Sequence, residues 1–269
     1  MTERLQLKVI CILCASLWLT CVVAFAQQSR NLTPAQLQIE KQQQRLSSSD
    51  PEERRDALMR LGSMRQAAAS RAALPGLQDE SAIVRATAVK SILSIGSEDS
   101  AAQLLPLLND KDEFVRRETA YALGLTHSRS ATAALSERLL NDKEDGVRAA
   151  AAVALGEIAD EAAVVALASA LAPELSAPAK KKQKREPNVF VLRAAAMALG
   201  RIKSRAGTAA LISALSNEKL SSDVRREAAR SLGLIGDPAA VPALRAATTA
   251  EDPFLSEIAH QALKKLSRG

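Results

Sequence analysis

The stretch VRAAAAVALGEIAD, residues Val147–Asp160, contains no reactive grouping, yet variants of it recur along the whole chain. The glycine of this phrase recurs at five positions: Gly62, Gly124, Gly156, Gly200 and Gly233. The first interval is 62 residues, twice 31, with Leu93 at its midpoint, and the later intervals are 32, 44 and 33 residues. A period held this closely is the signature of stacked structural repeats.

Each repeat is predicted to contain two helices. The first follows an acidic turn such as Asp50-Pro51-Glu52-Glu53, where a capping aspartate precedes a proline at the first helical position. We expect the recurring glycine and the polar residues after it to end this helix. The second helix carries leucines at four-residue spacing, which form one face that only neighbouring helices can bury. These leucine pairs are Leu104 and Leu108, Leu135 and Leu139, Leu167 and Leu171, and Leu211 and Leu215.

The predicted fold is all-α, an α-solenoid of about six and a half two-helix repeats of about 31 residues over positions 50–269. The composition agrees, because 47% of the chain is hydrophobic but only 2% is aromatic, and alanine and leucine favour helices. Residues 27–49 are predicted to form a linker and a polar capping helix that starts near Thr33-Pro34. A final half-repeat is expected to close the other end.

The repeated phrase D-x-x-VR-x-x-A-x-x-A-L-G-x-I, followed by a second apolar helix, resembles HEAT-like repeats of the type first named from phycobilisome lyases. The resemblance extends from Asp50 to Gly269. It implies the α-solenoid architecture and says little about function, because such repeats serve many unrelated tasks.

The first 26 residues have the features of a signal peptide. Arg4 and Lys8 precede a continuous apolar run from Val9 to Ala26, which closes on the small-x-small pattern Ala24-Phe25-Ala26. The sequence therefore predicts export, into a bacterial periplasm. The alternative is an uncleaved membrane anchor, because 18 apolar residues approach the length that spans a bilayer. Cleavage would change the net charge from +6 to +5.

Catalytic, cofactor-binding and metal-binding groups are not expected in this chain. All three cysteines, Cys11, Cys14 and Cys21, lie in the predicted signal peptide, so no thiol nucleophile or ligand would remain. Metal enzymes built on HEAT-like repeats carry His-Glu pairs, but neither His127 nor His260 precedes a glutamate. No Gly-x-Ser-x-Gly motif or glycine-rich phosphate loop occurs. We therefore expect no enzyme activity, no cofactor and no metal.

Nucleic acid is not an expected partner either. Base stacking needs exposed aromatic side chains, and the chain after residue 26 has only Phe114, Tyr121, Phe190 and Phe254. The three phenylalanines recur just before the first helices, where we expect them to wedge between repeats.

Arginines recur at one position of the first helices: Arg54, Arg85, Arg116, Arg148 and Arg225. In a stack they would form a ladder, either an anion-binding stripe or a structural joint. We favour the joint, with each guanidinium paired to a turn carboxylate such as Asp79, Asp110 or Asp142 or to helix-end carbonyls. The fifth repeat has Leu192 at this position and Arg193 one residue later, so one rung is expected to be missing.

The interval of 44 residues contains an insertion at about 173–187, read as a loop because it combines prolines with closely spaced charges. Its basic residues are Lys180, Lys181, Lys182, Lys184 and Arg185. We expect a solvated insertion; the functional alternative is weak contact with an anionic membrane surface or polymer.

The second helices are expected to line the concave face of the solenoid. Their predicted outward residues are Arg71, Gln78, Gln103, Glu137, Arg138, Ser169, Ser213 and Arg245. A surface of small residues with scattered polar groups favours a protein or peptide partner. The leading hypothesis is thus an exported, non-enzymatic interaction scaffold. The alternatives are an enzyme or accessory protein resembling bilin lyases, and a peripheral binder of anionic surfaces; the oligomeric state stays open.

Overall fold

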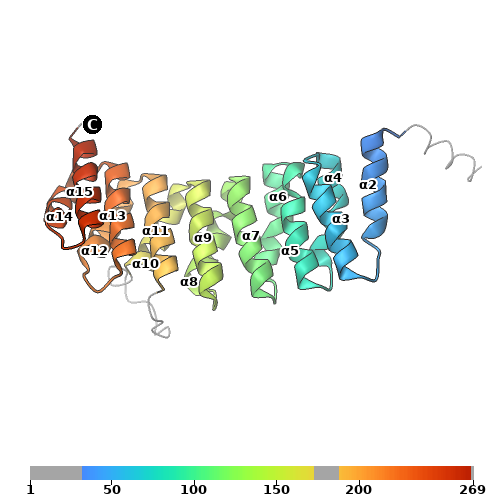
Figure 1. Cartoon of the computed structure of the whole chain (residues 1–269), viewed down its shortest axis with the longest axis horizontal. Helices are drawn as coiled ribbons and strands as arrows, with labels where there is room; N and C mark the ends of the chain where they lie inside the picture. The colour runs from blue at the N-terminus through green and yellow to red at the C-terminus, as the bar shows by residue number, and fades with distance from the viewer. Residues whose placement is uncertain (1–31, 173–187, 268–269) are drawn as a thin grey trace, which may run out of the picture.

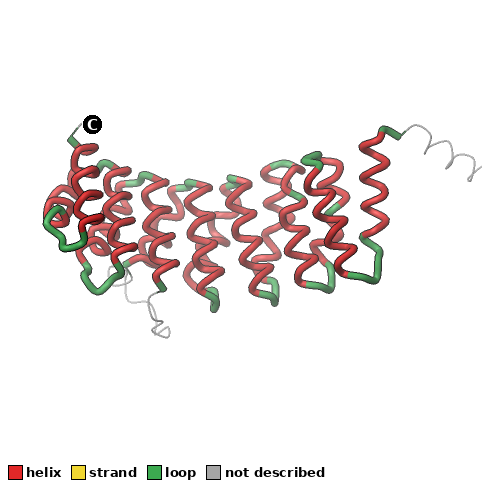
Figure 2. The backbone as a smooth tube through the Cα atoms, in the orientation of Figure 1, coloured by secondary structure: helices red, strands yellow, loops and turns green. Residues whose placement is uncertain are grey.

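The computed structural model describes residues 32–172 and 188–267 as an elongated array of helices (Figure 1), and no strand occurs within them (Figure 2). Short connections alternate with antiparallel helices, so each helix pair stacks on the next along one axis. The predicted all-α solenoid is confirmed.

The first helices of the repeats form one layer and contact one another in sequence order. They are α3 (Pro51–Ser63), α5 (Ala82–Ser91), α7 (Glu113–Thr126), α9 (Asp145–Ile158), α11 (Val189–Ile202), α13 (Ser222–Ile235) and α15 (Pro253–Leu266). The polar helix α2 (Pro34–Arg45) precedes them and packs against α3 and α4.

The second helices form the other layer. They are α4 (Ala67–Ala72), α6 (Ser97–Leu104), α8 (Thr132–Asn141), α10 (Val164–Leu171), α12 (Thr208–Ser216) and α14 (Val241–Ala247). Four of them, α8, α10, α12 and α14, are preceded by one 3₁₀ turn: η4 (Arg129–Ala131), η5 (Glu161–Ala163), η7 (Arg205–Gly207) and η8 (Pro238–Ala240).

The second helices of the first two repeats change to 3₁₀ geometry at a proline. Helix α4 is followed by η1 (Leu74–Gln78), which contains Pro75, and α6 by η3 (Leu105–Asn109), which contains Pro106. Proline lacks a backbone N–H and its ring clashes with the carbonyl four residues earlier, so a regular α-helix cannot pass through it.

The acidic turns cap the first helices. The Asp112 carboxylate accepts hydrogen bonds from the backbone N–H groups of Phe114 and Val115, and Asp252 accepts one from Phe254. Asn188 takes the same role at the start of α11. Such caps satisfy N–H groups that have no partner within the helix.

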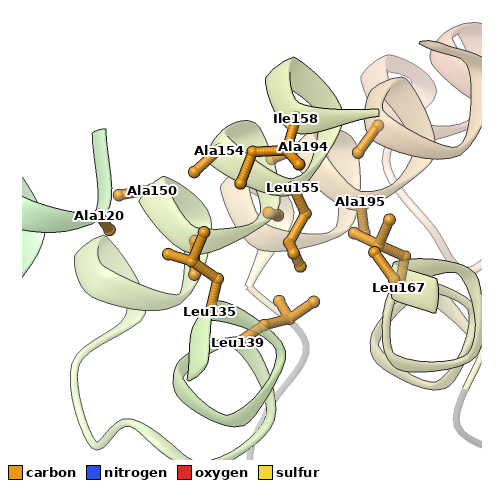
Figure 3. Packing of buried hydrophobic residues seen from close by; sticks show 14 of the residues in the cluster. Ala120, Leu135, Leu139, Ala150, Ala154, Leu155, Ile158, Leu167, Ala194 and Ala195 are labelled. Carbon is orange, nitrogen blue, oxygen red and sulfur yellow. The ribbon is translucent and has the colours of Figure 1, made fainter. Parts of the chain in front are cut away.

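The core lies between the two layers. All eight leucines of the four predicted pairs are buried. Figure 3 shows Leu135 and Leu139 on the side of α8 that faces α9, and Leu167 on the side of α10 that faces α11. Within the described residues, no helix is both long and apolar enough to cross a membrane.

The first helices end one or two residues after the recurring glycines, close to where the sequence predicts, but the glycines lie inside the last turn and are not themselves the terminating residues. Helix α7 continues two residues beyond Gly124, and α9 two residues beyond Gly156. A Cβ atom on Gly124 would lie 2.8 Å from the Cα atom of Ala154, so the glycine lets α7 and α9 approach closely. The chain leaves the helix at the next left-handed residue, which is His127 after α7 and Ala159 after α9.

The second repeat has Leu93 where five other repeats have this glycine. There α5 ends early at Ser91, and the 3₁₀ turn η2 (Leu93–Ile95) follows. Gly96, with φ of 133°, then occupies the turn, in a region of backbone conformation that favours glycine.

We predict that Gly124→Ala lowers the free energy of unfolding by about 1–3 kcal/mol, because the added methyl group overpacks the crossing of α7 and α9. Urea unfolding followed by circular dichroism measures the change. Gly146→Ala is the matched control, since its Cβ would meet only the Arg117 side chain at 3.7 Å in the first turn of α9. The control should be neutral or stabilising by up to about 1 kcal/mol; equal stability of both variants would contradict the close-approach role.

Candidate functional site

The repeated arginines lie at the joints between successive repeats. The Arg116 guanidinium donates two hydrogen bonds to the Asp142 carboxylate, both 2.9 Å long, and a third to the Asp110 carbonyl oxygen. Arg85 holds Asp110 in the same way, with hydrogen bonds of 2.7 and 2.8 Å, and Arg54 holds Asp79. These three arginines are only 5–7% exposed, so their guanidinium groups join repeats and do not offer a free anion site.

The same contacts keep the acidic partners ionised. Burial opposes ionisation of Asp79, Asp110 and Asp142, but the arginine hydrogen bonds and a backbone N–H bond outweigh it. The pKa of each carboxyl therefore lies below its usual value.

The ladder changes beyond Asp142. Arg148 donates to the Leu139 carbonyl oxygen and pairs with Asp145 of its own helix, while Arg225 donates to the Leu215 carbonyl oxygen. Neither of them holds an aspartate of the following repeat in the described residues. In the fifth repeat Leu192 is buried and Arg193 is exposed.

Lowered pKa values of the ladder carboxyls make stability depend on pH. An unfolded chain binds protons at these groups at a higher pH than the folded chain does, so acid favours unfolding. The ladder's contribution is complete at neutral pH and is lost as the pH falls below about 4. Urea midpoints measured from neutral pH to about pH 3 should fall less steeply in Asp110→Asn than in the wild type. Asp99→Asn, at an exposed carboxylate without an ion pair in the described residues, should retain the wild-type slope.

The outward face of the second helices is built from small side chains. One exposed row, with one residue from each second helix, contains Arg71, Ala102, Ala133, Val165, Ala209 and Pro242. Val165 is 77% exposed, the highest value among the exposed large hydrophobic residues of the described chain. We call this row and the side chains flanking it the second-helix face.

A hollow of about 440 Å³ lies on this face between α8 and α10. Apolar atoms of Ala133, Leu140 and Val165 form much of its lining. Arg129 and Ser136 are polar residues of the same wall. Volumes of roughly 300–1,000 Å³ are typical of small ligand sites, so the hollow can admit one or a few side chains of a partner.

Metal-binding geometry is absent from the described residues, where no three His, Cys, Asp or Glu side chains gather. His127 is exposed and its ring Nδ1 lies 2.9 Å from the Glu157 carbonyl oxygen. His260 is exposed on α15.

The repeat geometry agrees with the comparison against protein families. A family model described as HEAT repeats matches residues 39–124, 101–180 and 178–264. The chain belongs to the HEAT-repeat family. No curated protein matches it.

Solved structures share this HEAT-repeat architecture. YibA of Escherichia coli is similar with a TM-score of 0.60 at 22% identity, over 90% of this chain and 84% of YibA. The complex of CpcE and CpcF of phycocyanin lyase from Nostoc sp. PCC7120 is similar with a TM-score of 0.50 at 24% identity, covering 88% of this chain and 92% of that one. Human deoxyhypusine hydroxylase is similar with a TM-score of 0.44 at 21% identity, over 86% of this chain and 85% of the hydroxylase. At these identities the likeness to YibA and to the CpcE–CpcF complex is one of fold alone.

The predicted partner-binding residues are spread along the HEAT array and are not gathered in one site. Arg71, Gln78, Gln103, Glu137 and Arg245 are exposed, from α4 at one end to α14 at the other. Arg138, Ser169 and Ser213 are half-buried. Arg138 is held by ion pairs to Glu137 and Asp142, and Ser169 is the one member of the set that lines the hollow.

Two predicted regions lie outside the described residues. One is the signal peptide at positions 1–26; the other is the insertion with Lys180, Lys181, Lys182, Lys184 and Arg185.

Sequence reasoning missed several residues of the joints and the face. Arg226, next to the predicted Arg225, forms the bidentate pair with Asp252 at 2.8 Å. The doubled arginine in VRREAA was the signal, but the period alone cannot say which of two adjacent arginines reaches the next turn. Val165 was also missed; its signal is a large residue where α8 has Ala133 and α12 has Ala209.

The expectation that the phenylalanines wedge between repeats is wrong for Phe190 and Phe254, each 67% exposed. Arg226 instead lies over the Phe254 ring, 5.1 Å from its centroid, and Arg117 lies over Phe114 at 5.2 Å. Cation–π contact holds such rings at the surface.

Proposed function

We propose that this HEAT-repeat chain is a non-enzymatic scaffold that binds a protein or peptide partner along its second-helix face, as the concave face of the solenoid. The observation that carries the proposal is the exposed row of small and apolar side chains across successive second helices, with the hollow near its middle. The interior leucines of these helices are already buried, so the exposed Val165 and Leu140 are not needed for the core.

The chemistry of the face supports a polypeptide partner. Small side chains let another backbone approach closely, and exposed apolar groups such as Val165 gain from being covered. Charges on the face are of both signs and scattered, for example Arg71, Glu137 and Arg245. Nucleic-acid binding depends on a basic surface that neutralises phosphates, which this face does not provide.

Affinity capture from the exported fraction, with quantitative mass spectrometry, tests the proposal. Val165→Arg and Ala133→Arg would block the second-helix face, while Tyr121→Arg and Leu125→Arg are matched controls on exposed hydrophobic positions of α7. We expect the same partner to be lost from the first pair of variants and retained by the second pair. Equal capture by all four would overturn the proposal, provided that circular dichroism shows each variant folded.

We further propose that the chain is exported to a bacterial periplasm after cleavage following Ala26. The support is the basic start, the apolar run and the small-residue site of residues 1–26. N-terminal sequencing of the chain from its native host should begin at Gln27. An N-terminus upstream of Val9 in the membrane fraction would instead establish the uncleaved anchor.

A further inference from the structure

We propose that the hollow between α8 and α10 takes an acidic–aliphatic peptide, with one aliphatic side chain in the hollow and a neighbouring carboxylate on Arg129. The inference rests on the proposed function, because it specifies the partner of the same face.

The hollow provides an apolar seat at the surface. Leu140 of α8 is 42% exposed and Val165 of α10 is 77% exposed, and both line it together with Ala133. At the position of Val165 the neighbouring repeats have Ala133 and Ala209, so the seat combines one large side chain with small ones. An aliphatic side chain that enters the hollow therefore covers exposed apolar surface, which is the main source of affinity at such sites.

One charged group of the hollow, the Arg129 guanidinium, is available to an anionic group of a partner. The lining of the hollow contains two charged residues, Arg129 and Asp160. The Asp160 carboxylate is already occupied, since it accepts hydrogen bonds from Thr132 Oγ1 at 2.9 Å and from the Ala162 N–H at 3.2 Å. Arg129 is exposed and forms no ion pair with any described residue. A carboxylate beside the aliphatic group would supply the missing partner in charge-assisted hydrogen bonds.

Ser136 gives a second indication that the hollow is incomplete. Its hydroxyl oxygen is shielded from solvent and has no hydrogen-bond partner in the described part of the chain, although the residue lines the hollow. Buried polar groups are nearly always hydrogen-bonded. A peptide carbonyl or N–H group at this wall would reach the hydroxyl once the Ser136 side chain turns toward the hollow, which favours a polypeptide over a purely aliphatic ligand.

The test selects short random peptides, displayed on phage, against the full chain. Peptides recovered on the wild type should be enriched in Asp or Glu within a few residues of Leu, Ile or Val. The variant Arg129→Glu should shift this enrichment to Lys or Arg, and Val165→Lys should abolish the aliphatic preference. Arg205→Glu is the matched control for the charge, because it changes the same repeat position two repeats farther along. Leu125→Lys is the matched control for the aliphatic side chain, because Leu125 is 61% exposed on α7, away from the second-helix face.

A synthetic peptide of the selected sequence then gives affinities by fluorescence anisotropy. Loss of a charge-assisted contact should weaken binding to Arg129→Glu about tenfold or more, with little change for Arg205→Glu. Peptides that bind the second-helix face without acidic preference would overturn this inference and leave the proposed function standing. If no recovered peptide binds the second-helix face, both this inference and the proposed function are overturned.

Discussion

Leu139→Asp is expected to open the repeats around α8 while both ends of the array stay folded. Leu139 is 0% exposed in the layer between α8 and α9, and an aspartate there would bury a carboxylate without a partner. Such a change lowers stability by more than about 4 kcal/mol. Because each repeat contacts only its neighbours, the damage should spread locally along the array.

Native-state hydrogen exchange measures this gradient of opening. Amides of α7 to α10 should lose protection first, and those of α3 and α15 last. Leu140→Asp is the matched control, because the Leu140 side chain, next to Leu139 in the sequence, is 42% exposed. This variant should change the free energy of unfolding by about 0.5 kcal/mol or less. Uniform loss of protection across all helices in Leu139→Asp would contradict the picture of a repeat-by-repeat array.

Asp142→Ala is expected to lower the free energy of unfolding by about 3–5 kcal/mol. It removes the bidentate partner of Arg116 and leaves that guanidinium buried at the joint of two repeats. Urea unfolding at neutral pH measures the loss. Asp223→Ala is the matched control, since its carboxylate is 58% exposed, pairs with Arg226 within α13 at 3.4 Å, and should contribute about 1 kcal/mol or less.

A double variant separates two effects on the free energy of unfolding: the cost of leaving Arg116 unpaired and the contribution of the Arg116–Asp142 pair itself. Replacing both partners by apolar residues, Arg116→Met with Asp142→Leu, removes the buried charge as well as its partner. We expect the double variant to be more stable than Asp142→Ala. A double variant less stable than the single one would show that the hydrogen bonds of Arg116 contribute more than its desolvation costs.

The architecture could be predicted from the sequence because a period of about 31 residues and leucines on one helix face both report burial, and burial decides the stack. The role of Gly124 could not be predicted, since one residue type serves both at helix ends and at close helix crossings. Likewise, His127 and Ala159 adopt the left-handed conformation that favours glycine, and nothing in their residue type indicates it.

The candidate site was harder to predict than the fold. The pattern marked the second helices as the available face, but it favoured polar residues such as Gln103 and overlooked Val165 and Leu140. Whether an apolar residue of a short helix points inward depends on how that helix is rotated about its axis. The 3₁₀ turns η4 and η5, which directly precede α8 and α10, change that rotation. Arg129 was overlooked because the sequence pattern does not show which arginines have an acidic partner nearby in the folded chain.

The contacts of Arg148 indicate where residues can be inserted between helices. The Arg148 guanidinium is held by Asp145 of its own helix and by the Leu139 carbonyl oxygen of the preceding repeat, so extra residues in the connection after α10 do not remove a partner of this cation. Lengthening the turn at Asp110 would instead pull a carboxylate away from Arg85. We therefore expect the stack to tolerate added residues between α10 and α11 better than added residues in the turn at Asp110.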